Sequence, residues 1–363
     1  MRILSVFWCD EVKTGAQKRL VHLLRGLAAR NYEVTLLTKE GYNFDVGSAN
    51  TIEFRDGITP SRRINSIISI ANRSSEKVNI YNTDLVIGFG IGSAVPGSYL
   101  KKITGAKLIY AMREHPVRIV CERSILKQKI FEMKNKIYFS AILREADYFV
   151  VQVETHKEEL VRKHKISRNN IRVIPNNIGV KSYISGGSKE VEEIAFVGTI
   201  SKRKGIDVLL KSARILKERE VVLKLHIAGE GPMEEWAQTY VSENNLEGQV
   251  TFHGFLDQVR RLMVRCDLVV IPSRVETFPN VALEAMSVGT PFIASDLREL
   301  RSAFGKATEH FPVGDPVALS DKVEALCEPE RYERLKEKTE ARREEFAFDW
   351  VGEFEKVMQE MAA

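Results

Sequence analysis

The sequence predicts an α/β protein made of two doubly wound domains, each with a mainly parallel sheet covered by helices. Strand-like and helix-like segments alternate along the whole chain, which is typical of parallel sheets with helical crossovers. A chain of 363 residues is longer than one hydrophobic core usually accommodates, so about two domains are expected. The alternation restarts after residues 176–188, a stretch rich in turn-forming residues that predicts a hinge.

Runs of apolar and β-branched residues predict the individual elements. In the first half, strands are expected at 3–7, 34–38, 84–87, 107–111 and 148–152, and one helix face carries Leu20, Leu23, Leu24, Leu27 and Ala28. In the second half, strands are expected at 193–198, 223–228, 250–254 and 268–271, and a helix face carries Ile206, Leu209, Leu210, Ala213 and Leu216. Ligands of such folds bind at the carboxyl ends of the strands.

The predicted domains are Rossmann-like and cover residues 1–180 and 190–345. The tail, at about 346–363, is predicted to be helical. Its apolar residues Phe346, Trp350 and Phe354, together with Val357, fall on one face of that helix.

Composition describes an ordinary globular protein. Hydrophobic residues make up 44% of the chain and charged residues 28%. No apolar stretch approaches the roughly 20 residues that span a bilayer, and the first strand is too short for a signal sequence. Cys9, Cys121, Cys266 and Cys327 are scattered without a close pair. We therefore expect no disulfide, no metal site and a cytosolic location.

Charge is distributed unevenly along the chain. Residues 1–180 hold 29 Lys and Arg against 17 Asp and Glu, whereas the remainder holds 25 against 32. The basic first half favours an anionic partner, although ordinary solvated surface charge explains the split equally well. No aromatic-interleaved basic stretch typical of nucleic-acid binding is present. An anionic membrane or a pyrophosphate-bearing acceptor fits better than nucleic acid.

Two glutamates eight positions apart, Glu276 and Glu284, lie in the most informative segment. An apolar strand at 267–271 precedes them, and the helix that carries the second one is closed by Gly289 and Pro291. A helix N-terminus attracts anions. One carboxylate on the loop and one on the helix could therefore bind sugar hydroxyls on either side of a bound phosphate. Two glutamates at this spacing also occur without any function.

From Glu276 to Pro291 the chain resembles the retaining glycosyltransferases of the GT-B fold, the large family 4 group that contains sucrose and glycogen synthases and many bacterial envelope-sugar transferases. Their signature is a Glu, seven residues and a Glu, followed by Ala-Met and Gly-Thr-Pro, as here. The resemblance covers most of the second domain and, more weakly, the first. It implies two Rossmann-like domains with a cleft between them, and a last helix that crosses back to the first domain.

The resemblance also assigns roles around this signature. It implies that Glu276 holds the hydroxyls of the donor sugar and that Glu284 holds the nucleotide ribose. Phe278, Asn280 and Val281, which lie between the two glutamates, belong to the same expected donor site. Enzymes of this kind typically need no metal, so no cofactor is expected.

A second motif, at 196–205, reads as a strand, a basic loop and a helix start. Its three successive cations, at 202–204, lie beside a helix N-terminus, where they are well placed to neutralise a diphosphate. In the resembled family Arg commonly follows the first glycine, here Gly198, and Lys-Gly closes the motif. Lys204 matches directly and is expected to be catalytic. Thr199 replaces the usual Arg, and Arg203 is expected to supply that cation.

Glycine-rich turns are expected to complete the donor site. By resemblance, Gly229 and Gly231 let the chain turn beneath the nucleotide, and the backbone around His253 faces the base. Near the N-terminus, Gly15 opens the first helix and offers N–H donors to a phosphate. For each of these glycines a plain structural turn is the alternative.

The first domain is expected to bind the acceptor. By resemblance, His115 helps to position the transferred sugar, and Arg113 is a candidate for contact with the acceptor. A lone His before Pro is also a common structural feature. Arg123, Lys127 and Lys134 are expected on a basic amphipathic helix that contacts an anionic membrane, with ordinary helix amphipathicity as the alternative.

The sequence therefore predicts a retaining enzyme that moves a sugar from a nucleotide diphosphate donor, expected to be a UDP-sugar, to a hydroxyl of a glycan or polyprenyl-diphosphate-linked acceptor. The expected location is cytoplasmic, with peripheral contact with the inner face of the cell membrane left open. Two alternatives remain. One is a GT-B sugar-nucleotide epimerase, which needs no acceptor, and the other is a non-catalytic module that binds an anionic lipid or polymer.

Overall fold

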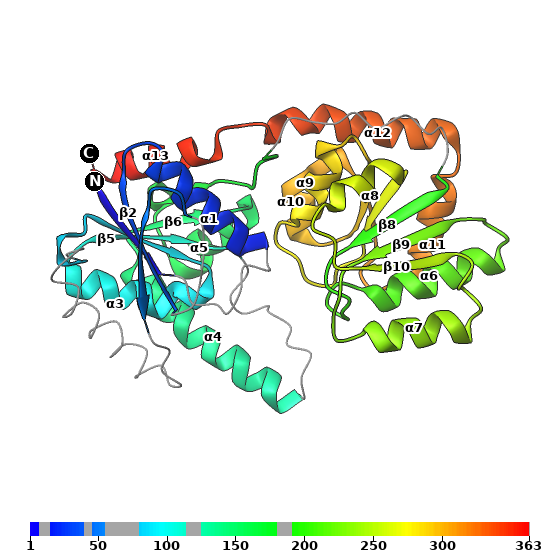
Figure 1. Ribbon diagram of the computed structural model, residues 1–363, viewed down its shortest axis with the longest axis horizontal. Coiled ribbons are helices and arrows are strands. Elements are labelled where there is room, and N and C mark those ends of the chain that lie inside the picture. Colours follow the sequence, from blue (N-terminus) through cyan, green and yellow to red (C-terminus); the bar gives the residue numbers. More distant parts are fainter. Residues whose placement is uncertain (7–14, 40–45, 55–79, 114–124, 180–190, 363) are drawn as a thin grey trace. The chain divides into compact units, whose positions relative to one another are not determined.

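The computed structural model describes residues 1–6, 15–39, 46–54, 80–113, 125–179 and 191–362. The chain divides into two compact units. The first contains Met1–Ile174 and Asp349–Ala363, and the second contains Pro175–Phe348. Each unit is an α/β fold with a parallel sheet of its own (Figure 1).

The first unit has a seven-stranded sheet with the order β3-β2-β1-β4-β5-β6-β7, and all its neighbouring strands are parallel. The strands are β1 (Arg2–Val6), β2 (Glu33–Lys39), β3 (Asn50–Phe54), β4 (Leu85–Phe89), β5 (Lys107–Ala111), β6 (Tyr148–Val151) and β7 (Ile171–Val173). The helices are α1 (Gly15–Ala28), α3 (Ala94–Thr104), α4 (Ile125–Glu145), α5 (Glu154–His164) and α13 (Trp350–Ala362), with short 3-10 turns at η2 (Ile80–Asn82), η3 (Ile91–Ser93) and η4 (Arg168–Asn170).

The apolar stripes found in the sequence form the core of this unit. All five residues of the predicted stripe on α1 are buried. The sequences of the central strands are continuous apolar runs because helices cover a parallel sheet on both faces. The edge strands β3 and β7 were not predicted. β3 is rich in polar residues and β7 has only three residues, so their apolar signal is weak.

The C-terminal helix α13 packs against α1 within the first unit. Trp350 is 1% exposed and lies among the largest fully buried side chains. Gly26 of α1 permits the close approach, because a Cβ there would lie 2.5 Å from a methyl carbon of Val351. Arg30 donates to Asp349 at 2.5 Å and to Glu355 at 3.0 Å. Apolar packing and ion pairs therefore fix the end of the chain to its beginning.

Phe346 is not on this helix, contrary to the prediction. It ends a 3-10 turn, η6 (Glu344–Phe346), in the second unit. Its ring lies 5.8 Å from the rings of both Phe278 and Phe304, measured between centroids. Periodicity alone placed it with the tail, because four apolar residues at helical spacing do not reveal a break in the helix between the first and the second.

The second unit has a six-stranded parallel sheet with the order β10-β9-β8-β11-β12-β13. The strands are β8 (Glu193–Val197), β9 (Lys224–Ala228), β10 (Val250–Gly254), β11 (Leu268–Ile271), β12 (Phe292–Ser295) and β13 (Glu309–Phe311). The helices are α6 (Ile206–Glu218), α7 (Glu234–Glu243), α8 (Val259–Arg265), α9 (Asn280–Ser287), α10 (Arg298–Phe304), α11 (Pro316–Ala325) and α12 (Pro329–Arg343), with 3-10 turns at η5 (Gly305–Ala307) and η6.

The strand order creates a switch point between β8 and β11. These two strands are neighbours in the sheet although two βα units separate them in sequence. The connections from β8 and from β11 therefore lead away in opposite directions, which opens a crevice beyond their carboxyl ends. The sequence motifs of the expected donor site lie in these two connections.

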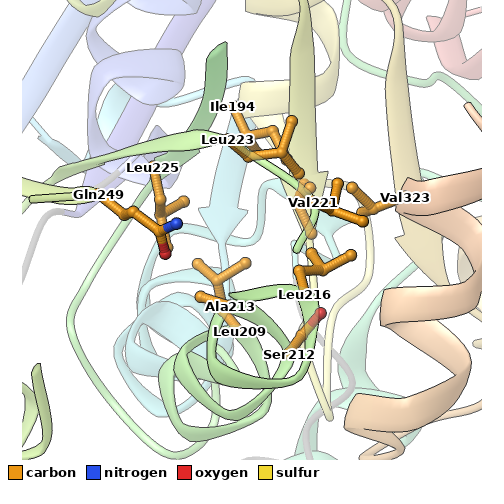
Figure 2. Close-up of a pocket in the computed structure, with 11 residues that line it drawn as sticks. Ile194, Leu209, Ser212, Ala213, Leu216, Val221, Leu223, Leu225, Gln249 and Val323 are labelled. Atoms are coloured by element: carbon orange, nitrogen blue, oxygen red, sulfur yellow. The ribbon is translucent and has the colours of Figure 1, made fainter. Parts of the chain in front are cut away.

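A pocket in this unit lies away from those loops, between α6 and the sheet. Figure 2 shows its lining, which comes mainly from apolar side chains of α6, the strands and the segment between them. The lining residues are Ile194, Leu209, Ser212, Ala213, Leu216, Val221, Leu223, Leu225, Gln249, Val270 and Val323. None of them is charged, so this pocket offers no group that would neutralise a diphosphate.

Candidate functional site

The site is built around an ion pair between the loops that follow β8 and β11. The ammonium group of Lys204 donates a hydrogen bond to the Glu276 carboxylate. Their side chains are 18% and 13% exposed, respectively. The two motifs thus meet at the carboxyl edge of the sheet, at the switch point where this fold class binds ligands.

Backbone packing fixes the position of Lys204. Gly205, which precedes α6, has φ of 75°, and a Cβ there would lie 1.9 Å from the carbonyl oxygen of Pro272. The loop after β8 therefore touches the end of β11 directly, and only glycine fits at this corner. The amide of Arg274 also donates to the carbonyl of Arg203 at 2.8 Å. These contacts hold the two loops in register.

Electrostatics keep Glu276 ionised. Burial by itself raises the pKa of this carboxyl, but attraction to Lys204, the hydrogen bond from Lys204 and the charge of Arg203 together outweigh burial. The pKa of Glu276 is therefore lower than its ordinary value. The carboxylate is an acceptor for hydrogen bonds, and it is not a proton donor at neutral pH.

Sequence reasoning missed the pair Arg274 and Asp207, which holds the basic loop at 202–204 in position. The guanidinium of Arg274 binds both carboxylate oxygens of Asp207, at 2.6 and 2.8 Å, and also donates to the carbonyl of Lys202 at 2.7 Å. Asp207 lies in the first turn of α6. A bidentate pair of this kind fixes orientation as well as distance. The sequence offered one sign of this pair, because Arg274 lies two positions before Glu276 in the predicted donor segment.

The glycine turns bring the loops after β8 and β9 into direct contact. Gly229 has φ of 140°, and a Cβ there would lie 2.0 Å from the carbonyl oxygen of Gly198. A Cβ on Gly231 would lie 2.4 Å from the carbonyl oxygen of Ile200. These glycines are therefore required for close packing of the backbone beside the basic loop.

Helix α9 presents three of its predicted donor residues at the surface. Asn280, Val281 and Glu284 are partly exposed, whereas the helix residues between them are buried. The Oδ1 atom of Asn280 accepts a hydrogen bond of 2.7 Å from the side chain of Asn176, another residue that the sequence did not single out. The first N–H groups of a helix lack intrahelical partners and can bind an anion.

Two predicted donor residues have side chains that contact other residues of the second unit. Phe278 is 6% exposed and packs against Phe304, so any contact with a donor must come from its backbone. The ring of His253 faces His226, with Nε2 at 3.1 Å from Nδ1. Its neighbour Gly254 accepts a hydrogen bond from the amide of Gly229 through its carbonyl, at 2.7 Å.

In the first unit, the predicted residues are scattered. Gly15 is the first residue of α1. Arg113 is buried, and its guanidinium carbon lies 4.9 Å from the ring centroid of Phe89 and 5.7 Å from that of Trp350. Burial, together with the charge of Arg19, lowers the pKa of Arg113 to about 9. Arg113 thus packs inside this unit, and its contact with an acceptor stays a prediction.

Four further residues predicted for the transferred sugar, the acceptor or the membrane can be placed only in part. His115 and Arg123 lie outside the described residues. Lys127 and Lys134 are on α4, and Lys134 is exposed.

Comparison with known families supports both units separately. Residues 184–342 match the sequence profile of the family described as glycosyl transferases group 1. Residues 13–180 match the profile described as Glycosyltransferase Family 4. The chain belongs to the GT-B glycosyltransferases. The predicted family and fold class are thereby confirmed.

Curated glycosyltransferases match parts of the chain. An uncharacterised glycosyltransferase of Methanocaldococcus jannaschii is 37% identical over 114 residues, which is 31% of this chain and 29% of that protein. The N-acetylgalactosamine-N,N'-diacetylbacillosaminyl-diphospho-undecaprenol 4-alpha-N-acetylgalactosaminyltransferase of Campylobacter jejuni is 27% identical over 188 residues, 50% of each protein. The matches span about half or less of the length of these relatives.

Solved structures share the fold over the full chain. Sucrose-phosphate synthase from Thermosynechococcus elongatus has a TM-score of 0.81 at 19% identity, and the match covers 99% of this chain and 98% of that one. The match to the Anabaena HepE protein, solved with UDP and glucose, has a TM-score of 0.77 at 16% identity and covers 99% of both chains.

Among the described residues, none of the helices has the length and apolar character needed to cross a bilayer.

Proposed function

We propose that this glycosyltransferase moves a sugar from a UDP-sugar to a hydroxyl of a glycan or lipid-linked acceptor with retention of anomeric configuration. The observation that carries the proposal is the pairing of Lys204 with Glu276 at the switch point of the second sheet. A cation and a carboxylate at the same edge match the diphosphate and the hydroxyls of the attached sugar in a nucleotide sugar. The HepE structure with UDP and glucose supports this choice of donor.

The two partners would exchange their contacts when the donor binds. Without a ligand, Lys204 neutralises Glu276. A diphosphate carries more negative charge than one carboxylate, so it would draw the ammonium group and release Glu276 to accept hydrogen bonds from sugar hydroxyls. During transfer, Lys204 would stabilise the charge that develops on the departing UDP, with Arg203 beside it. Glu284 would hold the ribose from α9.

Release of UDP in the presence and absence of an acceptor tests this proposal. Lys204→Met and Glu276→Gln should each lower turnover by about 10²–10³-fold, the loss typical when one group that stabilises transition-state charge is removed. Lys211→Met and Glu235→Gln are matched controls, because both side chains are exposed in the same unit. Wild-type turnover in the two site variants would refute the assignment.

The identity of the product separates the proposal from its alternatives. Proton NMR of the product should show the anomeric configuration of the donor, and an inverted product would contradict retention. A GT-B epimerase would convert the UDP-sugar with no acceptor present. Thermal stabilisation by UDP, GDP and ADP, which reaches about 2.7 kcal/mol at a hundredfold excess over Kd, should be largest for UDP.

Helix α4 supports a second component of the proposal, contact with an anionic membrane. Ile130, Met133 and Ile137 are 52%, 59% and 61% exposed, and their spacing places them on one side of the helix. Figure 1 shows the first half of α4 projecting past α3. Phe139 and Ile142 on the same helix are buried. The helix is therefore apolar on two sides, which differs from the simple amphipathic helix that was predicted.

Lysines beside this exposed apolar side complete the match to an anionic bilayer. Lys129, Lys134 and Lys136 are exposed on α4, and apolar side chains flanked by lysines favour the interface of acidic lipids. Vesicles of phosphatidylglycerol, but not of phosphatidylcholine, should sediment the protein. The double variant Ile130→Ser/Ile137→Ser should lose this binding, whereas Val222→Ser, at the 83% exposed site in the other unit, should retain it. Equal sedimentation of both variants would overturn the membrane contact.

A further inference from the structure

A second group of chemically reactive side chains lies in the same unit, away from the donor loops. Glu193 begins β8, His226 lies within β9, and Cys266 ends α8 just before β11. One carboxylate oxygen, one ring nitrogen and the sulfur of these three residues all lie within 4.8 Å of one another. Carboxylate, imidazole and thiolate are the three side-chain ligands that Zn²⁺ uses in proteins.

The orientation of His226 is fixed by a second histidine. Its Nδ1 atom lies 3.1 Å from Nε2 of His253, within hydrogen-bonding distance. Its Nε2 atom lies 3.3 Å from the Glu193 carboxylate, yet it is buried and has no hydrogen bond of acceptable geometry among the residues that the structure describes. A histidine that binds a metal through one nitrogen typically has its other nitrogen held in this way.

The backbone holds the other two residues in place. The Asp267 carboxylate accepts hydrogen bonds from the amides of Glu192 and Glu193, at 2.9 and 2.8 Å. The amide of Asp267 donates in turn to the carbonyl of Glu193, at 2.8 Å. Glu193 and Cys266 are therefore attached to the same rigid junction of β8 and β11. The distance between them is set by the fold before any ion arrives.

The charge balance of the group favours a cation. Cys266 is 4% exposed. Burial, together with the carboxylates of Glu193 and Asp267, raises the pKa of its thiol to about 12. A divalent ion bound among these groups would offset the negative charge of the Glu193 carboxylate.

We propose that Glu193, His226 and Cys266 form a binding site for Zn²⁺. The ion would bind the Sγ of Cys266, Nε2 of His226 and one carboxylate oxygen of Glu193, with a water molecule as the fourth ligand, and the thiol proton would pass to solvent. Ligand atoms about 2.0–2.3 Å from a tetrahedral ion lie roughly 3.3–3.8 Å apart, so the groups, which now lie within 4.8 Å of one another, would move closer by about 1 Å. Sulfur and imidazole ligands select Zn²⁺ over Mg²⁺.

The position of the site indicates a structural role. Glu193 is the first residue of β8, and Gly198 follows the last. At about 3.3 Å per residue, this places Glu193 roughly 16 Å along the strand from the donor loops, while His226 pairs with Ala195 two residues further along β8. A bound ion would cross-link β8, β9 and the segment between α8 and β11. The proposal is thus independent of the catalytic assignment, and its test does not require activity.

Cobalt titration of the full chain tests the site directly. Co²⁺ should bind at one equivalent and give the visible bands of a tetrahedral ion with a thiolate-to-metal absorption in the near ultraviolet, and Zn²⁺ should remove both. Cys266→Ser should abolish the thiolate band. Cys327→Ser is the matched control, because Cys327 is the other described free cysteine and lies outside the group. It should leave the band unchanged.

Two further measurements make the result decisive. His253→Gln should weaken Co²⁺ binding by about 10–100-fold while preserving the thiolate band, as expected for a residue that orients a ligand. Zn²⁺ should raise the Tm of the wild-type protein but not of Cys266→Ser. The proposal is overturned if the wild-type protein gives no thiolate band, if the band survives in Cys266→Ser, or if it is lost in Cys327→Ser.

Discussion

Removal of the Lys204 ammonium by Lys204→Met should destabilise the second unit strongly at neutral pH. The substitution keeps the length of the side chain but leaves the Glu276 carboxylate without its main partner. Breaking one side of a buried ion pair costs about 3–5 kcal/mol. Because Glu276 also feels the charge of Arg203, we expect about 3 kcal/mol. In urea this corresponds to a midpoint shift of about 1.5 M for a slope of about 2 kcal/mol/M.

The pH dependence of this loss follows from the pKa of Glu276. In the wild-type protein that pKa is lowered from 4.5. The folded carboxylate therefore adds stability above pH 4.5, and the contribution is lost as the pH falls through the folded pKa. In Lys204→Met, burial without the ammonium raises the pKa, so protonation relieves the strain as the pH falls. The difference in unfolding free energy between the two proteins should shrink from pH 7 to pH 4.5.

A double variant separates stability from function. Lys204→Met/Glu276→Gln removes both charges and should recover most of the stability lost in Lys204→Met, because no buried charge is left unpaired. Its UDP-sugar transfer should remain as low as in the single variants. Urea unfolding followed by circular dichroism measures the first quantity. A loss below about 0.5 kcal/mol in Lys204→Met, or no recovery in the double variant, would refute the reasoning.

Three further predictions follow from the packing. Gly229→Ala should cost more than about 3 kcal/mol, because its Cβ would lie 2.0 Å from a carbonyl oxygen, whereas Gly248→Ala, with open space around it, should be nearly neutral in thermal unfolding. Arg274→Lys should raise the KM for the donor by about tenfold with a smaller change in kcat, because a lysine cannot reproduce the bidentate contact that supports the basic loop; an unchanged KM would contradict this role. Trp350→Ala should destabilise the first unit by about 3–5 kcal/mol. Trp236→Ala, at a 36% exposed position, should cost less than about 1 kcal/mol. Equal losses in the two variants would show that α13 contributes little to the stability of the first unit.

Local sequence was sufficient for most elements with strong apolar signals. The strands predicted at 107–111, 250–254 and 268–271 coincide with β5, β10 and β11, because helices on both faces of a parallel sheet require continuous apolar runs. The sequence missed β12 and β13, which are only four and three residues long. Length alone is not the reason, because β11 also has four residues. β12 ends in Ala-Ser and β13 has one apolar residue, so their apolar signals are weaker than the continuous run of β11.

The donor motifs could also be found from the sequence, because their glycines and charges occur at fixed spacing on strand ends and helix starts. Their supports could not. Arg274 binds Asp207 across 67 positions of the chain, and the ring of Phe278 turned out to belong to an aromatic cluster with Phe304 and Phe346. Whether a side chain faces a ligand or the core depends on partners that are distant in sequence.

The sequence by itself therefore determined the family, the parallel α/β architecture and the motifs of the expected donor site, since these depend on local periodicity and short motifs. Only the tertiary structure decided which groups meet. It paired Lys204 with Glu276 through the order of β8 and β11, and it assembled Glu193, His226 and Cys266 from three separate elements. Strand order in a parallel sheet is set by crossover packing over many residues, so distances between such elements are a property of the folded chain.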